Sequence, residues 1–318
     1  MTKPSSVKVR VRVPATSANL GPGFDTLGLA LDLHNFVELG AGDDCDRVTS
    51  GGSQNVELPQ DETNIALGAA RRLLASFGAP RTPLHLHLEN HIPFARGLGS
   101  SAAARAGALF AAGEWARQNG WGEAEPGKLL ALATQLEGHP DNAAAALLGG
   151  LVVSCTLSAD AAEVVALRVP VEKFPRFLVF VPQHELATSE ARRVLPINVS
   201  RQDANFNISR SSLLVAALSA EHWEMLPHAL QDRLHQDARA ALLPGFEEIT
   251  GAARDAGAFG ATLSGAGPSI LIWLPDDEQI VSQTRRAVEE VATANNVEGE
   301  IIETKVDLYG CEIVESKL

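Results

Sequence analysis

The chain has 318 residues, of which 45% are hydrophobic and 20% charged, with a formal net charge of -13. This length is too great for one average hydrophobic core, so two compact lobes are expected. The apolar content and the lack of low-complexity runs indicate an ordinary globular protein rather than a disordered one. The acidic balance argues against nucleic acid or an anionic membrane as partner, because both attract clustered lysine and arginine.

Cysteine usage and the apolar segments bear on the cellular setting. Cys45, Cys155 and Cys311 are odd in number and far apart, which predicts neither a disulfide framework nor a zinc site and fits a reducing, cytoplasmic environment. The N-terminal residues alternate instead of forming an apolar core, so no secretory signal is expected. The longest apolar stretch, residues 143–153, is shorter than the roughly 20 residues that cross a bilayer.

The first half of the chain begins with valines that alternate with lysine and arginine over residues 7–13, which predicts a strand with one buried face. A loop over 14–25 is expected to follow it. The spacing of apolar residues and glycines then predicts, in order, a helix over 63–77, a strand over 84–88, a helix over 100–117, a helix over 126–137, and a helix end, two glycines and a strand start within 143–153.

The second half mixes strands and helices without strict alternation. The expected elements are a strand over 177–181, helices around 211–230, a helix over 246–256, two strands and a glycine turn over 260–273, a helix over 277–294 and a strand over 300–306. This order favours an α+β fold over a doubly wound sheet. The seam between lobes is placed near residues 158–172, giving an N-terminal domain over 1–165 and a C-terminal domain over 166–318.

The strongest local motif is PFARGLGSSAAARAG, residues 93–107. Gly97 and Gly99 let backbone amides approach an anion closely, and Ser100 and Ser101 lie at a predicted helix N-terminus, where the helix dipole favours phosphate. A simple Gly-Ser turn that caps a helix is the alternative. A dinucleotide-binding loop is disfavoured because HIPFAR, rather than a buried strand, precedes the glycines. A Walker A loop around Lys128 is disfavoured because Leu129 stands where serine or threonine is required.

Two further segments carry polar groups beside glycine or proline. In PATSANLGPGFD, Asn19 and Asp25 flank a glycine-rich turn that can present an amide and a carboxylate to a ligand, or can satisfy its own backbone. In EGHPDN, Glu137 and Asp141 surround His139. These carboxylates can bind Mg²⁺ or orient a hydroxyl, while a helix cap formed by Asp141 is the alternative.

Together these segments resemble the GHMP kinase superfamily and, within it, the homoserine kinase family. The similarity rests on PFARGLGSSAA, PATSANLGPGFD, EGHPDN, GATLSGAGPSILIW and TSEARRVLP, which lie between residues 14 and 273. The resemblance implies a two-lobe fold, with an N-terminal lobe like domain 2 of ribosomal protein S5 and a ferredoxin-like C-terminal lobe. It also implies ATP-dependent phosphorylation of the side-chain hydroxyl of L-homoserine, a step in threonine biosynthesis, with ATP and Mg²⁺ and, by analogy, a homodimer. Another GHMP kinase with a different acceptor and a non-catalytic ATP or amino-acid sensor are the alternatives.

The same resemblance assigns roles to individual residues. For ATP it implies Asn64, Pro93, Phe94, Ala95, Arg96, Gly97, Leu98, Gly99, Ser100, Ser101, Ala102 and Ala103; for the metal, Ser101 and Glu137; for the amino acid, Asn19, Asp25, His139, Asn142, Arg192 and Arg239; and for catalysis, Asp141, Glu137 and Asn19. Asp141 is the candidate general base, although a transition state that loses its proton late needs none. Asn64 has the alternative role of starting a helix.

The residue types assigned to the amino acid agree with the chemistry of the expected substrate. Two short segments near them depart from the family pattern. A zwitterion needs a carboxylate for its ammonium group and a guanidinium for its carboxylate, which Asp25 and Arg192 or Arg239 provide. The family's DNVAP reads DNAAA after His139, and its DRxHQPYR reads DRLHQDAR, which retains Arg239 but changes its neighbours.

Overall fold

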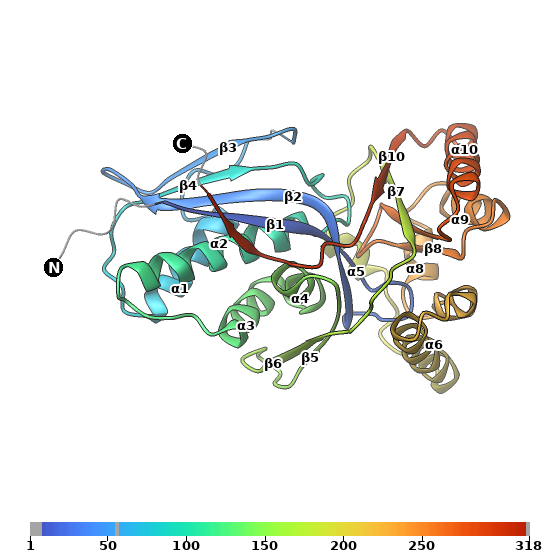
Figure 1. Ribbon diagram of the computed structural model, residues 1–318, viewed down its shortest axis with the longest axis horizontal. Coiled ribbons are helices and arrows are strands. Elements are labelled where there is room, and N and C mark those ends of the chain that lie inside the picture. Colours follow the sequence, from blue (N-terminus) through green and yellow to red (C-terminus); the bar gives the residue numbers. More distant parts are fainter. Residues whose placement is uncertain (1–7, 55–56, 316–318) are drawn as a thin grey trace.

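The computed structural model describes residues 8–54 and 57–315 and shows two lobes side by side, each built on its own sheet (Figure 1). Helices and strands are mixed in both lobes, so the expected α+β class is confirmed. The two predicted strands joined by a glycine turn near residues 260–273 are also present, and they lie at the junction of the lobes.

The first lobe contains a seven-stranded sheet. Its main path runs β11-β1-β2-β4-β3, and the first part of β2 also pairs with β5, which pairs with β6. The pair β3 and β4 is parallel and the other pairs are antiparallel. The strands span Val9–Ala18 (β1), Leu27–Ala41 (β2), Arg47–Gly51 (β3), Leu84–Glu89 (β4), Leu151–Thr156 (β5), Val164–Arg168 (β6) and Glu312–Val314 (β11).

Helices α1 (Ile65–Ser76), α2 (Ser100–Gln118), α3 (Pro126–Glu137) and α4 (Asp141–Leu148) cover one face of this sheet (Figure 1). The alanine-rich α2 is buried along most of its length, because its small side chains let it lie close to the strands. At Gly107 a side chain would meet Val13 and Val37 of the sheet. This close packing fixes the position of the N-terminus of α2, where the predicted phosphate loop ends.

The second lobe contains an antiparallel sheet with the order β10-β7-β9-β8. Residues of β7 alternate between two hydrophobic clusters, with Leu178 and Phe180 facing one and Phe177 and Val179 facing the other. The strands span Arg176–Pro182 (β7), Gly260–Leu263 (β8), Ile270–Leu274 (β9) and Gly299–Thr304 (β10), and the helices span Thr188–Arg193 (α5), Arg201–Ser219 (α6), Trp223–Met225 (η1, a 3₁₀-helix), Leu226–Ala229 (α7), Gln236–Ala240 (α8), Phe246–Asp255 (α9) and Glu278–Ala294 (α10).

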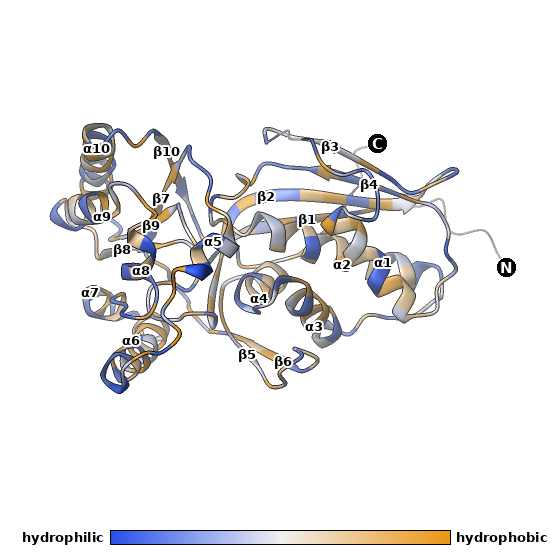
Figure 2. Cartoon of the chain, turned by 180° about the vertical axis from the view of Figure 1, so that it is seen from behind, coloured by the Kyte–Doolittle hydropathy of each residue, from blue (hydrophilic) through white to orange (hydrophobic). Residues whose placement is uncertain are grey.

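Several segments differ from the sequence prediction. The first strand continues through part of the expected loop to Ala18, with a register shift between Pro14 and Ala15, and Val7 lies outside the described residues. Strands β2, β3, β6 and β11 and helices α5 and α8 were not predicted from the sequence. Helix α6 begins at Arg201, well before the expected helical region near 211, and its first half is hydrophilic (Figure 2). Its start is fixed by Ser200, whose hydroxyl accepts the amide proton of Asp203.

The end of the chain returns to the first lobe. After β10 in the second sheet, residues Arg10–Arg12 of β1 pair with Glu312–Val314 of β11. Asp307 anchors the returning segment, because its carboxylate lies 2.7 Å from Nε2 of His34 and accepts the amide protons of Tyr309 and Gly310. The division at residues 165 and 166 remains a prediction, and the segment after β10 belongs spatially to the first sheet.

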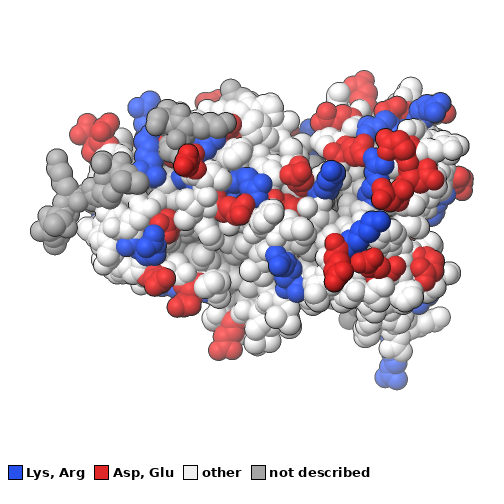
Figure 3. Space-filling model, viewed as in Figure 1, with Lys and Arg blue, Asp and Glu red and all other residues white. Residues whose placement is uncertain are grey.

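The described surface carries charges of both signs. On the face drawn in Figure 3, acidic and basic side chains lie close together over the second lobe, and acidic groups are prominent there. Among the described residues, no helix has both the length and the hydropathy needed to cross a membrane.

Candidate active site

A cavity of about 300 Å³ lies between the lobes, and most of the predicted site residues line it. The lining includes Asn19, Asp25, Asn64, Phe94, Ala95, Arg96, Gly97, Gly99, Ser100, Ser101, Ala102, Glu137, His139, Asp141, Asn142, Arg192 and Arg239. Pro93, Leu98 and Ala103 do not line it. Leu98 and Ala103 are buried in the hydrophobic core, so their side chains support the loop from behind.

The glycine-rich segment forms the start of α2 at one end of the cavity. Gly99 adopts φ 69° and begins the helix without a capping side chain, which leaves the first amides of α2 without partners inside the helix. The Ser100 hydroxyl is buried and has no hydrogen-bond partner among the described residues. These unpaired donors and the helix dipole make this end of the cavity suited to a phosphate group.

The same segment is held against the second lobe by the turn between β8 and β9. The Ser264 hydroxyl donates to the Gly97 carbonyl at 2.7 Å, and the Ser269 amide donates to the Arg96 carbonyl at 3.2 Å. Gly97 adopts φ 75°, and a side chain there would overlap the Ser264 carbonyl. The guanidinium of Arg96 also donates to the Gln183 carbonyl at the end of β7. The geometry of this glycine-rich segment therefore depends on both lobes.

Asp25 and Arg192 face each other at the other end of the cavity. Two guanidinium nitrogens of Arg192 donate to the two carboxylate oxygens of Asp25, at 3.1 and 2.6 Å. Burial lowers the pKa of Arg192, but the hydrogen bond and charge of Asp25 more than offset this effect, so the pKa is raised. Asn19 supports the turn, because its Oδ1 accepts the Asp25 amide proton at 3.0 Å and its Nδ2 donates to the Gly265 carbonyl.

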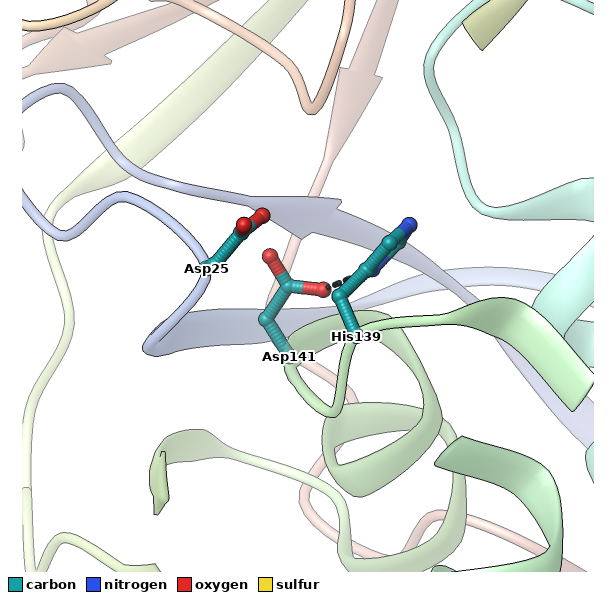
Figure 4. A group of neighbouring side chains, drawn as sticks. All are labelled: Asp25, His139 and Asp141. Carbon is teal, nitrogen blue, oxygen red and sulfur yellow. Dashed lines mark hydrogen bonds and ion pairs between the residues drawn. The ribbon is translucent and has the colours of Figure 1, made fainter. Parts of the chain in front are cut away.

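His139 and Asp141 lie beside this pair, with their polar atoms directed toward one another (Figure 4). His139 Nδ1 is 2.8 Å from Asp141 Oδ1, and the same oxygen accepts the Asn142 amide proton at 2.7 Å. Burial lowers the pKa of His139, but the hydrogen bond and charge of Asp141 outweigh it and raise the pKa above the ordinary value. The second oxygen of Asp141 points toward Asp25 (Figure 4).

Arg239 is buried behind Asp25 and Arg192. Its guanidinium donates to the Ala191 carbonyl at 3.2 Å and lies 3.1 Å from Nδ1 of His235, whose other ring nitrogen donates to the Gly21 carbonyl. Burial and the neighbouring positive charge of Arg192 lower the pKa of Arg239 to about 10. The two arginines place a concentration of positive charge at this end of the cavity, suited to a carboxylate.

Oxygen ligands for a hard cation also line the cavity. The Ser101 hydroxyl is 3.1 and 3.2 Å from the two carboxylate oxygens of Glu137, and Arg105 contacts one of these oxygens. A hydroxyl and a carboxylate beside a phosphate-binding helix terminus fit the ligand preference of Mg²⁺. Asp25, His139 and Asp141 also cluster, with His139 bonded to Asp141 and Arg192 to Asp25.

One predicted cavity residue has a second role, and several other cavity residues were not predicted from the sequence. Asn64, which was predicted to contact ATP, lines the cavity, and its Oδ1 also caps α1 by accepting the amide protons of Ala66 and Leu67; contact with ATP remains a prediction. Leu186, Ala187 and Thr188 line the cavity from the segment that leads into α5. TSEARRVLP was the available sequence signal for this segment, because it carries Thr188 beside the predicted Arg192.

Comparison with known proteins identifies the family. Models of the GHMP kinase N-terminal domain and of the GHMP kinase C-terminal domain match residues 64–150 and 214–293. The chain is 41% identical to a homoserine kinase of Desulfitobacterium hafniense, over 96% of this chain and 100% of the relative, and 44% identical to one of Moorella thermoacetica, over 82% and 86%.

Solved structures agree with this assignment. A homoserine kinase structure from Cytophaga hutchinsonii superposes with a TM-score of 0.86 and 29% identity, covering 99% of this chain and 100% of that chain. A mevalonate kinase structure has a TM-score of 0.66 at 16% identity, covers 94% of this chain and 99% of that chain, and shares the fold. The predicted two-lobe GHMP kinase fold is thus confirmed, and the chain belongs to the homoserine kinase family.

Proposed function

We propose that this protein transfers the γ-phosphoryl group of ATP to the side-chain hydroxyl of L-homoserine, forming O-phospho-L-homoserine for threonine biosynthesis. One observation carries the proposal: the uncapped N-terminus of α2 and the paired charges of Asp25 and Arg192 line the same cavity. The homoserine kinases that match nearly the full length of the chain support the same substrate.

The charged groups at the acceptor end match those of an amino-acid zwitterion. The ammonium group of the substrate would bind Asp25, and its carboxylate would bind Arg192, with Arg239 behind it. In this arrangement the substrate replaces the direct ion pair between Asp25 and Arg192 with two ion pairs of its own. The side-chain hydroxyl is then free to extend toward the N-terminus of α2 and the terminal phosphate of ATP.

Ser101 and Glu137 would hold Mg²⁺, which neutralises negative charge on the phosphates when it is bound. The first amides of α2 and the Ser100 hydroxyl contribute donors to the same phosphates. Phosphoryl transfer depends mainly on such charge stabilisation and on alignment of the acceptor. The cavity can supply both charge stabilisation and alignment, because the N-terminus of α2 and the Asp25–Arg192 pair line the same space.

The environment of Asp141 bears on whether a general base takes part. Its Oδ1 is occupied by His139 and the Asn142 amide, and the raised pKa of His139 favours an imidazolium beside it. An adjacent positive charge weakens a carboxylate as a proton acceptor. We therefore propose that Asp141 mainly orients the acceptor hydroxyl, which gives up its proton late in the transfer.

The proposal is tested by measuring ADP release with Mg-ATP and a panel of L-homoserine, L-serine, L-threonine, mevalonate and galactose. Turnover is expected with L-homoserine, and ³¹P NMR of the product should show a phosphate monoester. Preferred turnover of another acceptor would overturn the substrate assignment but leave kinase activity intact. ATP binding without turnover of any acceptor would instead indicate a sensor.

A further inference from the structure

Thr16, in the last part of β1, connects the phosphate loop to the acceptor site. It is fully buried, and its backbone amide donates to the Leu98 carbonyl at 3.0 Å. Its hydroxyl donates to Asn142 Oδ1 at 2.8 Å. A side chain at Gly99 would overlap the Thr16 hydroxyl and would also approach Asn142. Thr16 thus lies directly beneath the glycine that begins α2, with Asn142 on its other side.

These contacts determine which end of the Asn142 amide faces the site. Asn142 Oδ1 accepts the Thr16 proton, and Nδ2 lies 3.4 Å from Asp141 Oδ1. A carboxylate oxygen can only accept, so the amide nitrogen is the group that belongs next to Asp141. With Oδ1 held by Thr16, the N–H groups of Asn142 are available to an oxygen atom in the cavity.

We propose that Thr16 is a positioning residue for phosphoryl transfer, which acts by holding Asn142 with its N–H groups directed toward the reacting oxygens. The inference rests on the proposed function, because it assumes that Asn142 contacts the acceptor or the transferred phosphoryl group. Without the Thr16 hydroxyl, the Asn142 amide keeps only the longer 3.4 Å contact with Asp141, so its N–H groups are held less firmly toward the substrate oxygens. The contact with Gly99 also keeps Asn142 in a fixed relation to the phosphate loop.

The test compares Thr16→Val, which keeps the shape and removes the hydroxyl, with Thr16→Ser, which keeps the hydroxyl. We expect kcat of Thr16→Val with L-homoserine to fall about 10- to 100-fold, the range expected when a reacting group is misplaced by about 1 Å. We expect KM for ATP to change by less than about threefold, because the helix terminus that binds its phosphates is retained. Thr16→Ser should recover kcat to within about threefold of the unmodified protein.

A matched control is available at the next position. Ser17 is also fully buried in β1, and its hydroxyl has no hydrogen-bond partner among the described residues. Ser17→Ala therefore removes a buried hydroxyl from the same strand without touching Asn142, and its kcat should stay within about twofold of the unmodified protein. An equal loss in Ser17→Ala and Thr16→Val would show a general effect on β1 and would overturn the proposal.

The action through Asn142 is tested by combining substitutions. In an Asn142→Ala background, Thr16→Val should lower kcat by less than about twofold, because the group that Thr16 positions is already gone. A full additional loss in that background would overturn the proposal, as would normal kcat in Thr16→Val alone. If the valine variant does not fold, Thr16→Ala is compared with Thr16→Ser in the same assays.

Failure of the proposed function gives a different result. If the unmodified protein does not phosphorylate L-homoserine, the substrate assignment fails, and the Thr16 contact is examined by NMR of the Asn142 side-chain amide. These signals are assigned by their loss in Asn142→Ala. A shift of the signals in Thr16→Val but not in Ser17→Ala supports the positioning contact, and unchanged signals in Thr16→Val overturn it.

Discussion

Asp25 and Arg192 neutralise each other when no amino acid is present. Each is about one-third exposed, so the pair is open to the cavity and a ligand can reach both charges. A molecule with only one of the two charges would separate the pair and leave one partner uncompensated, which is costly in a partly buried site. The ion pair therefore favours ligands that carry both an ammonium group and a carboxylate.

Asp25→Asn is expected to raise KM for L-homoserine about 30- to 1,000-fold, because loss of one member of a hydrogen-bonded charge pair typically costs about 2–4 kcal/mol. KM for ATP should change little. Arg193→Ala is the control, since Arg193 is exposed and only 4.0 Å from Glu190 in a surface ion pair. Steady-state kinetics with each substrate varied in turn measures both effects; an equal increase in KM for ATP would contradict this role for Asp25.

His139 should make stability depend on pH through its contact with Asp141. Its pKa is raised above the ordinary histidine value of 6.5, so the stabilisation is fully present below about pH 6.5 and is lost as pH rises through the higher folded-state pKa. The difference in free energy of unfolding between the unmodified protein and His139→Gln should therefore shrink as pH rises from 6 to 9. Urea unfolding measures it, and His222→Gln, at an exposed histidine, is the control. A difference that stays constant with pH would refute this account.

At the scale of elements, the glycine-rich loop over residues 93–99, which we propose binds phosphate, is shaped by its contact with the turn between β8 and β9. Gly97 and Gly99 both adopt positive φ, and in each case a side chain would overlap a neighbouring group. Glycine is needed here for space as well as for backbone conformation. The loop and the β8–β9 turn must therefore keep their relative position for the N-terminus of α2 to remain open to ATP.

Gly97→Ala is expected to weaken ATP binding at least about tenfold and to lower the melting temperature, because its methyl group would push the loop away from the Ser264 carbonyl. Gly127→Ala is the matched control: no atom lies within 4 Å of the added methyl group, and the site is in helix α3. That change should leave ATP binding unchanged and stabilise the protein by up to about 1 kcal/mol. Calorimetry measures the affinity of each variant for ATP, and thermal unfolding measures its melting temperature. Normal ATP binding by Gly97→Ala would show that the loop tolerates displacement.

The sequence was most informative where local patterns carry the signal. Ser100 and Ser101 follow closely spaced glycines, and this pattern was enough to predict the start of α2 at Ser100. Strand β2 was missed because its burial does not alternate: five buried residues, Leu27–Leu31, precede a mixed segment. The hydrophilic first half of α6 concealed the start of that helix for a similar reason, since an exposed helix has little apolar periodicity.

The candidate site was predictable in composition but not in its contacts. Motif similarity suggested Asp25, Arg192 and Asn142, whereas the bond between Thr16 and Asn142 joins residues 126 positions apart and leaves no local pattern. The ion pair between Asp25 and Arg192 spans 167 positions in the same way. The first contact depends on how α4 packs against β1 and the second on how the lobes pack, and a single sequence reveals neither.

At the scale of the whole molecule, Asp307 ties the returning chain to the first sheet. Burial raises the pKa of Asp307, but hydrogen bonds from His34 and from the amides of Gly310 and Tyr309, with the charge of Arg12, lower it overall. A carboxylate with a lowered pKa stabilises the folded state above its unfolded pKa, and this stabilisation is lost as pH falls through the folded value. The anchor should therefore be strongest at neutral pH.

Asp307→Asn should lower the free energy of unfolding at pH 7 by about 2–4 kcal/mol, because it removes a buried charge from its partners. The loss should diminish below about pH 3.8, the ordinary pKa of an aspartate carboxyl group. Asp276→Asn is the control, because Asp276 is exposed and 3.7 Å from Lys173. Denaturant unfolding at several pH values measures both variants, and equal small losses would show that Asp307 is not an anchor.

The pairing of β1 with β11 also imposes an order in time on biosynthesis. Arg12 and Glu312 are 300 positions apart, so at about 5–20 residues per second the ribosome makes the partner of β1 about 15–60 s after β1 itself. During that interval this edge of β1 is unpaired, and unpaired edges invite association with other chains. Arg10 and Arg12 lie in the stretch of β1 that later pairs with β11, and their like charges disfavour pairing of this edge with another nascent copy until β11 arrives.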